Sequence, residues 1–152
     1  GDVYKRQSED NVLECFTSGE SDVICLFGDD TVRRIDLTKL VEANGKIASV
    51  LKNKDVYKSV KVGVGGYSIT FNDSIEIEKW LLLKSGKKIN VSGKDLYSFV
   101  GDNIVDTAKA CEILGCSKQN LTYLIDKGRL KPIKPDLKEN LFFRGDVEKN
   151  SW

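Results

Sequence analysis

The residues after Ser117 would form a helix with polar side chains on one face. The opposite face would be apolar, with leucine or isoleucine at positions 121, 124 and 125. Long polar side chains on an exposed helix can hydrogen-bond the base edges in the major groove of DNA, where all four base pairs differ. The residues expected to face bases are Lys118, Gln119, Thr122 and Tyr123, with Asn120 at the edge of the face.

Positive charge is concentrated around this segment, although the whole chain is almost neutral. The 152 residues carry 24 basic and 23 acidic side chains, a net charge of +1. Residues 116–135 hold five basic side chains against Asp126 alone, a local charge of +4, and the remaining residues sum to −3. Because basic side chains neutralise DNA phosphates, we expect phosphate contacts from this segment. The residues are Ser117, through the free amides of a capped helix start, and Lys127, Arg129, Lys131 and Lys134.

A second short helix is expected directly before this one. Asp106 can cap a helix over residues 107–114. Its apolar stripe would consist of Ala108, Cys111 and Leu114, with Ala110 and Ile113 beside it. Gly115 supplies the left-handed residue that ends such a helix, and Lys127 with Gly128 would close the second helix. Two short helices joined by a tight glycine turn match the geometry of a helix-turn-helix.

Two stretches make this pattern more specific. The first is Val-Asp-Thr-Ala-Lys-Ala-Cys-Glu-Ile-Leu-Gly-Cys-Ser from Val105, and the second is Leu-Ile-Asp-Lys-Gly-Arg-Leu from Leu124. With them, residues 104–147 resemble the excisionase and MerR class of winged helix-turn-helix domains. The resemblance implies that residues 131–134 and 141–144 form the strands of a wing, and that a final helix starts at 145–148. It also implies phosphate contacts by Lys131, Lys134, Lys138 and Arg144.

Two positions depart from that class. Asp126 stands where a basic residue is common late in the second helix, and Tyr123 stands where arginine is frequent. These departures leave open a degenerate version of the domain that binds protein instead of DNA. An ordinary two-helix hairpin with a glycine turn would also produce the first half of the pattern.

The first half of the chain has the alternation and turn residues of β-structure. Strands are expected at residues 12–16, 22–27 and 31–35. Asp36 would cap a short helix over 37–43, and a further helical turn would follow at Ile47. Residues 59–64 and 67–71 flank Gly65-Gly66, a hairpin signal. The periodicity of residues 74–83 fits a strand or a helix.

The stretch Leu26-Phe27-Gly28-Asp29-Asp30-Thr31-Val32-Arg33-Arg34-Ile35-Asp36-Leu37 and the hydrophobic run after it resemble the bacterial family catalogued as domain of unknown function 2442. The resemblance covers residues 10–85, implies a small α/β domain and brings no activity with it. The expected fold class is α+β, with a small β-rich α/β domain at residues 8–91 and a winged helix-turn-helix at 102–152. Residues 94–100 would form a connecting helix, and residues 1–7 are expected to be a non-native tail.

Several residue types argue against an enzyme. The chain has no histidine, the commonest general base and metal ligand. Asp29, Asp30 and Asp36 could hold a metal as a cluster, but their turn and cap positions favour a local structural role. The cysteines at positions 15, 25, 111 and 116 lack the Cys-x-x-Cys spacing of zinc sites, so buried thiols are expected, with a structural disulfide left open. We expect no catalytic residue, metal or cofactor.

The function class follows from these observations. The longest wholly apolar run, Trp80-Leu81-Leu82-Leu83, is too short to span a bilayer, so a cytoplasmic protein without a membrane partner is expected. The sequence predicts sequence-specific binding of double-stranded DNA by a small bacterial or phage transcriptional regulator. An antitoxin-like protein, a recombination directionality factor (excisionase) and a protein-interaction module are the alternatives. The expected partners are double-stranded DNA and, through residues 8–91, a second copy of the chain or another protein.

Overall fold

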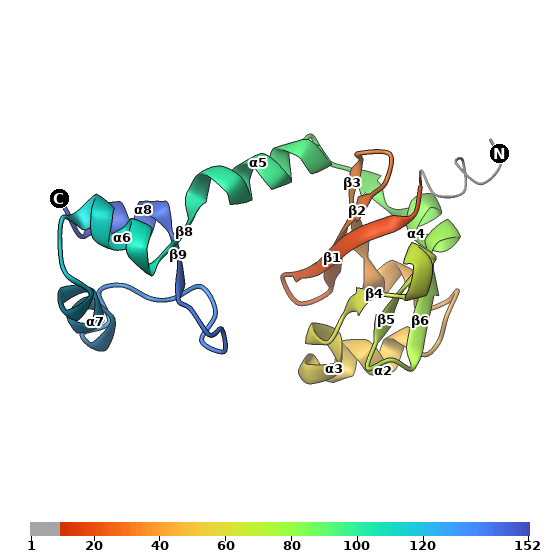
Figure 1. The fold of residues 1–152 in the computed structure, drawn as a ribbon. Helices are drawn as coiled ribbons and strands as arrows, with labels where there is room; N and C mark the ends of the chain where they lie inside the picture. Colours follow the sequence, from red (N-terminus) through yellow and green to blue (C-terminus); the bar gives the residue numbers. More distant parts are fainter. Residues whose placement is uncertain (1–9) are drawn as a thin grey trace. The chain divides into compact units, whose positions relative to one another are not determined.

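The structure is a computed structural model that describes residues 10–152, and it combines helices with antiparallel sheets (Figure 1). The chain forms two compact units, with the boundary between Asp95 and Leu96. The expected tail at residues 1–7 lies outside the described residues. No helix in the described part of the chain is long and apolar enough to cross a membrane.

The first unit contains two antiparallel sheets. One has the strand order β1-β2-β3-β7 and the other β4-β5-β6. The strands are β1 (Val12–Ser18), β2 (Asp22–Phe27), β3 (Val32–Asp36), β4 (Lys61–Val62), β5 (Ser68–Phe71), β6 (Ile75–Glu78) and β7 (Lys87–Lys88). The first three confirm the predicted strands to within two residues at each end.

Short helices connect these strands. They are the 3-10 helices η1 (Leu37–Leu40) and η2 (Val64–Gly66) and the α-helices α2 (Ile47–Lys52), α3 (Lys54–Lys58) and α4 (Lys79–Ser85). The predicted connecting helix is α5 (Gly93–Asn103), which follows β7 and continues past the boundary between the two units. The Asp36 cap is confirmed, because its carboxylate accepts the backbone N–H of Thr38 at 3.0 Å. The predicted helix over 37–43 is shorter than expected and ends at Leu40. Helix α3 was not predicted, although the Asn53 side chain caps it.

The predicted hairpin around Gly65-Gly66 is confirmed in its antiparallel pairing, but its loop spans residues 63–67 and not the two glycines alone. Both glycines have positive φ, 72° and 78°, and β4 pairs antiparallel with β5. Strand β4 has only two residues, because the chain leaves the ladder at Gly63 and enters η2. Residues 74–83 form both candidate structures in succession, β6 and then the start of α4.

The core of the first unit combines residues from both sheets and the helices between them. Its most enclosed members include Val23, Cys25, Phe27, Ile35, Leu37, Ile47, Val50, Ile69, Phe71, Ile77 and Leu82. The Tyr57 ring is also buried there, and its hydroxyl donates to the Asp22 carbonyl. This bond fastens α3 to the start of β2.

The second unit is a small helical cluster with a two-stranded sheet. Its elements are β8 (Ile104–Asp106), α6 (Thr107–Leu114), α7 (Lys118–Asp126), β9 (Leu141–Phe143) and α8 (Arg144–Lys149). Helix α6 has the predicted bounds, and α8 starts one residue before the predicted final helix. The core consists of Val105, Ala110, Leu121, Leu130, Phe142 and Val147.

Candidate nucleic-acid interface

Helix α6 and the turn after it set the position of α7. The Asp106 carboxylate caps α6 by accepting the backbone N–H of Lys109 at 2.8 Å. At the other end Gly115 adopts a left-handed conformation, with φ of 62°. The backbone N–H of Cys116 then donates to the Cys111 carbonyl at 3.1 Å, and that of Gly115 to the Glu112 carbonyl at 3.3 Å. This pair of bonds is a Schellman motif, which turns the chain sharply after a helix.

The predicted apolar stripe of α6 is wrong at one position. Ala108 is exposed, whereas Ala110 is fully buried against the core. The buried face therefore runs through Ala110, Cys111 and Leu114, which share one side of the helix at i, i+1 and i+4. Ala108 and Ala110 have the same side chain, so composition could not decide which of them faced inward.

Helix α7 is anchored by its cap and by one apolar face. The Ser117 hydroxyl accepts the backbone N–H of Asn120 at 3.2 Å, as predicted for the N-cap. Leu121 is only 1% exposed, and Leu124 and Ile125 are half-buried against the same core. Gly128 ends the helix with φ of 71°, and Leu130 is buried immediately afterwards. The opposite face of α7 does not pack against the core of the second unit.

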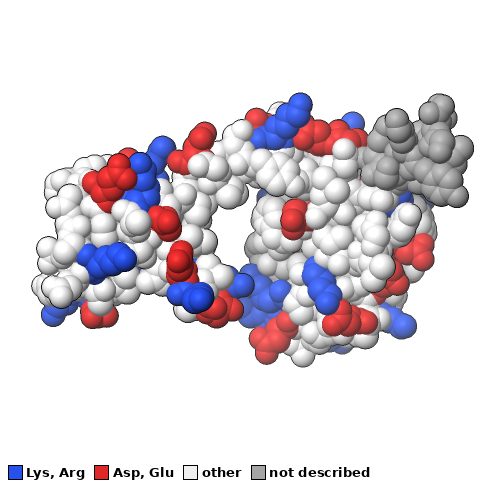
Figure 2. All heavy atoms as spheres, in the orientation of Figure 1, with Lys and Arg blue, Asp and Glu red and all other residues white. Residues whose placement is uncertain are grey.

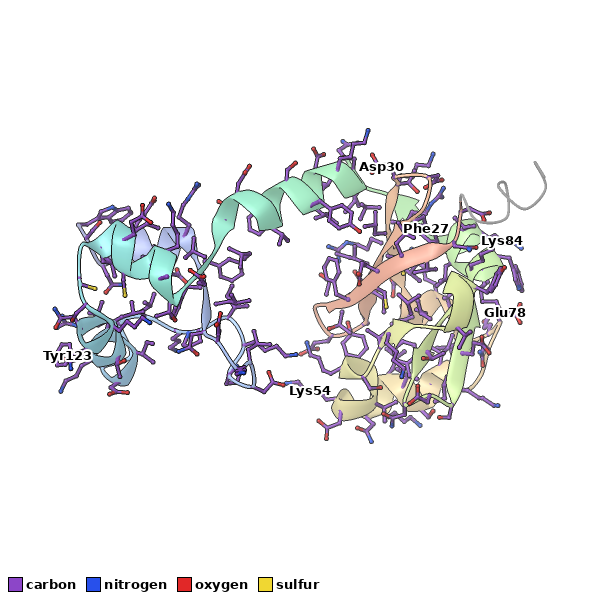
Figure 3. The ribbon with its side chains drawn as sticks, in the orientation of Figure 1. Phe27, Asp30, Lys54, Glu78, Lys84 and Tyr123 are labelled. Carbon is purple, nitrogen blue, oxygen red and sulfur yellow. The ribbon has the colours of Figure 1, made fainter. Side chains whose placement is uncertain are left out.

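That free face carries all five side chains predicted to face bases. They are Lys118, Gln119, Asn120, Thr122 and Tyr123, and each is exposed. Tyr123 is 52% exposed and lies on the side of α7 turned away from α6 (Figure 3). The Lys127 ammonium lies 5.6 Å from the centre of the Tyr123 ring, a cation–π contact. The Thr122 hydroxyl donates to the Lys118 carbonyl at 3.0 Å. The polar ends of Lys118, Gln119, Asn120 and Tyr123 have no hydrogen-bond partner within residues 10–152.

The seven residues predicted to approach phosphates are also exposed. They are Ser117, Lys127, Arg129, Lys131, Lys134, Lys138 and Arg144. Two of the six cations face carboxylates. Lys134 lies 3.7 Å from Asp136, and Arg144 lies 3.8 Å from Glu148 while also donating to the Asn103 side chain at 3.0 Å. Among the described residues the other four cations have no carboxylate partner, so they offer unneutralised positive charge.

The predicted wing is wrong in its first strand. Residues 131–134 form no strand, and β9 pairs with β8, not with this segment. Only one backbone bond links the two predicted wing strands, from the Ile133 N–H to the Leu141 carbonyl at 2.7 Å. The ladder stops because Pro135, the next residue on the same side of the chain as Ile133, has no N–H to donate.

One basic residue was missed by the sequence reasoning. Lys149, Arg129 and Lys131 line a shallow hollow of about 240 Å³, together with Gly128 and Asp146. Lys149 lies 3.8 Å from the Asp146 carboxylate. Residues 145–148 were predicted to start the final helix, but no role was assigned to Lys149; a basic residue in the last turn of a helix was the available signal.

Charge on the second unit is mixed. Figure 2 shows Lys and Arg side chains alternating with Asp and Glu over the face that it draws. Asp126 is exposed at the end of α7, close in sequence to Lys127. Any attraction for a polyanion must therefore come from the particular side chains around α7, because the surface as a whole is not strongly positive.

Asp29 and Asp36 of the acidic cluster have the predicted local structural roles, whereas the Asp30 carboxylate accepts the backbone N–H of Lys94, 64 residues later, at 2.9 Å. The Asp29 carboxylate accepts the backbone N–H and the hydroxyl of Thr31, at 3.0 and 2.6 Å. Burial opposes its ionisation, yet these bonds and the charges of Arg33 and Lys88 lower the pKa of Asp29. The pKa of Asp36 is lowered chiefly by the hydrogen bond from the Thr38 hydroxyl. Among the described residues no group of three or more Cys, Asp or Glu could hold a metal ion.

The four cysteines are free thiols. Cys25 is fully buried, and the other three are half-buried, so the prediction of buried thiols is confirmed in full for Cys25 and in part for the rest. Comparison of the chain with protein-family models, curated proteins and solved structures gives no match, so both family resemblances stay predictions.

Proposed function

We propose that the second unit binds double-stranded DNA sequence-specifically and that the protein is a small transcriptional regulator. In this proposal α7 lies in the major groove as the recognition helix of a helix-turn-helix. Nine residues at 1.5 Å each make α7 about 13 Å long, similar to the ~12 Å width of the groove. The observation that carries the proposal is the sidedness of α7, with Leu121 buried and every predicted base-facing side chain exposed.

The free side chains of α7 suit base recognition. Lys118 can donate to the O6 and N7 acceptors of guanine, and Gln119 or Asn120 can form the two-bond contact with adenine. All three belong to the first turn of α7, the end that recognition helices direct toward base edges. Tyr123, one turn further on, offers a ring and a hydroxyl to the same groove.

The flanking cations would hold the protein on the DNA backbone. Lys127, Arg129, Lys131 and Lys138 are exposed and have no carboxylate partner in the part of the chain that the structure describes, so pairing with phosphates would break no ion pair seen there. Such contacts fix the register of a recognition helix but carry no sequence information. Lys149 lies beside Arg129 and Lys131, but its ammonium is 3.8 Å from the Asp146 carboxylate, so it is partly neutralised.

Selection from a pool of random-sequence duplexes tests the proposal. The native chain should enrich one sequence motif over successive rounds. A triple variant, Lys118→Ala, Gln119→Ala and Tyr123→Ala, should bind the pool without enriching any motif, because its remaining contacts are to phosphates.

The matched control is Lys109→Ala, an exposed lysine on α6 that lies 3.4 Å from Glu112. It removes one charge from the same unit without touching α7 and should leave the selected motif unchanged. A folded native chain that enriches no motif refutes sequence-specific binding. Retention of the motif by the triple variant refutes the assignment of α7.

A further inference from the structure

Two cysteines meet at the turn between α6 and α7. Cys111 lies in the last turn of α6, and Cys116 directly follows the left-handed Gly115. The Schellman motif brings the side chains at these two positions together, normally as an apolar contact. Here both are thiols, and the backbone N–H of Cys116 donates to the Cys111 carbonyl at 3.1 Å, so the two residues lie side by side at the edge of the same core. Both are half-buried and free, so they remain within reach of small reagents.

A second pair of cysteines in the chain provides a comparison. Cys15 and Cys25 lie directly opposite each other on β1 and β2. Cys25 is completely buried, and burial raises the pKa of Cys15 to about 11 and that of Cys25 further. Burial, followed by the nearby Cys111, also raises the pKa of Cys116. Since the thiolate is the reactive form, the core pair should react far more slowly than the pair at the turn.

We propose that Cys111 and Cys116 form a reversible disulfide, made by exchange with a small-molecule disulfide, that regulates DNA binding by α7. One protein thiolate attacks the reagent, forming a mixed disulfide and releasing one reagent thiol. The second protein thiolate then attacks the protein sulfur and releases the other reagent thiol. The two protein thiols are oxidised to one disulfide, the reagent is reduced to two thiols, and these take up the two protons.

The consequence for DNA follows from the position of the pair. A disulfide bond of about 2 Å is shorter than a contact between two thiols, so oxidation draws Cys116 toward α6. The next residue, Ser117, is the N-cap of α7, so the amide end of that helix moves with Cys116. This regulatory step rests on the proposed function. A coupling of ordinary size would make the oxidised form bind duplex DNA at least about five-fold more weakly.

The test treats the native chain with oxidised glutathione and follows two readouts. Peptide mass mapping without reduction should recover a Cys111–Cys116 disulfide within one chain before any Cys15–Cys25 disulfide. Titration of the reduced and oxidised forms with a random-sequence 30-bp duplex at fixed salt should show the loss of affinity, reversed by dithiothreitol. Cys116→Ser should bind equally with and without oxidant, and Cys15→Ser should respond as the native chain does.

The outcomes separate this inference from the proposed function. If mapping finds only mixed disulfides, links between chains or the Cys15–Cys25 bond, the inference is wrong even when DNA binding is normal. If the Cys111–Cys116 bond forms and affinity is unchanged, its regulatory role is wrong. If the bond forms but neither form binds DNA, the proposed function fails and the regulation fails with it.

Discussion

Replacing Lys131 by alanine should weaken binding to every duplex by the same factor and reduce the salt dependence of binding. Lys131 is exposed, has no carboxylate partner among the described residues and lines the hollow shared with Arg129 and Lys149. Each phosphate that a cation neutralises releases counterions and contributes about −0.9 to the slope of log K against log [salt]. Lys131→Ala should therefore make the slope shallower by about 0.9.

The proposed phosphate contacts also give an expected slope for the native chain. Four predicted phosphate-facing cations have no carboxylate partner between residues 10 and 152, which gives a slope of about −3.6 if each meets one phosphate. Lys134 and Arg144 face Asp136 and Glu148, and their participation would steepen the slope to about −5.4. Lys134→Ala should have a smaller effect than Lys131→Ala, because Lys134 is already partly neutralised.

The assay is a fluorescence-anisotropy titration of a labelled 30-bp duplex at several potassium chloride concentrations. The charge-matched control is Lys46→Ala, an exposed lysine of the first unit, which should leave the slope unchanged. A native slope near zero would refute the phosphate contacts altogether. If Lys131→Ala and Lys46→Ala gave equal changes, the effect would be one of net charge and not of position.

Three further predictions concern stability. Leu121 is 1% exposed, so Leu121→Ala should lower the free energy of unfolding by about 2–5 kcal/mol. Urea denaturation should show this as a lower midpoint with an unchanged m-value. A loss below about 1 kcal/mol would mean that Leu121 does not anchor α7 to the core. Tyr57→Phe removes the donor to the Asp22 carbonyl and should cost about 1–2 kcal/mol in the same assay, whereas no loss would show that the carbonyl finds another donor. The lowered pKa values of Asp29 and Asp36 mean that the folded state favours both carboxylates, so their contribution to stability is complete above the unfolded pKa of 3.8 and is lost as pH falls through the lower folded values. A thermal midpoint that stays constant from pH 7 to pH 2 would contradict this sign.

The parts that the sequence predicted well are those coded by neighbouring residues. Ser117 and Asp106 cap helices through bonds to amides three residues away, and Gly115 ends α6 through its own φ angle. The strand pairing of β9 could not be predicted from neighbouring residues, because its partner β8 lies almost forty residues earlier. The prolines argue against pairing with residues 131–134 but do not indicate β8. The last-turn position of Lys149 is a local signal, but its place beside Arg129 and Lys131 depends on how α8 packs, which the sequence pattern does not give.

The pairing of β8 with β9 forms the small sheet of the second unit, to which the segment joining α7 to β9 adds one backbone bond, from the Ile133 N–H to the Leu141 carbonyl. Residues 134–140 thus behave as an insert between two fixed points, the buried Leu130 and the strand that starts at Leu141. Doubling the length of such a segment costs only about 0.6 kcal/mol in closure entropy. Segments of other lengths and charges could therefore replace residues 134–140, and the second unit would keep its fold while its proposed contacts with DNA phosphates changed.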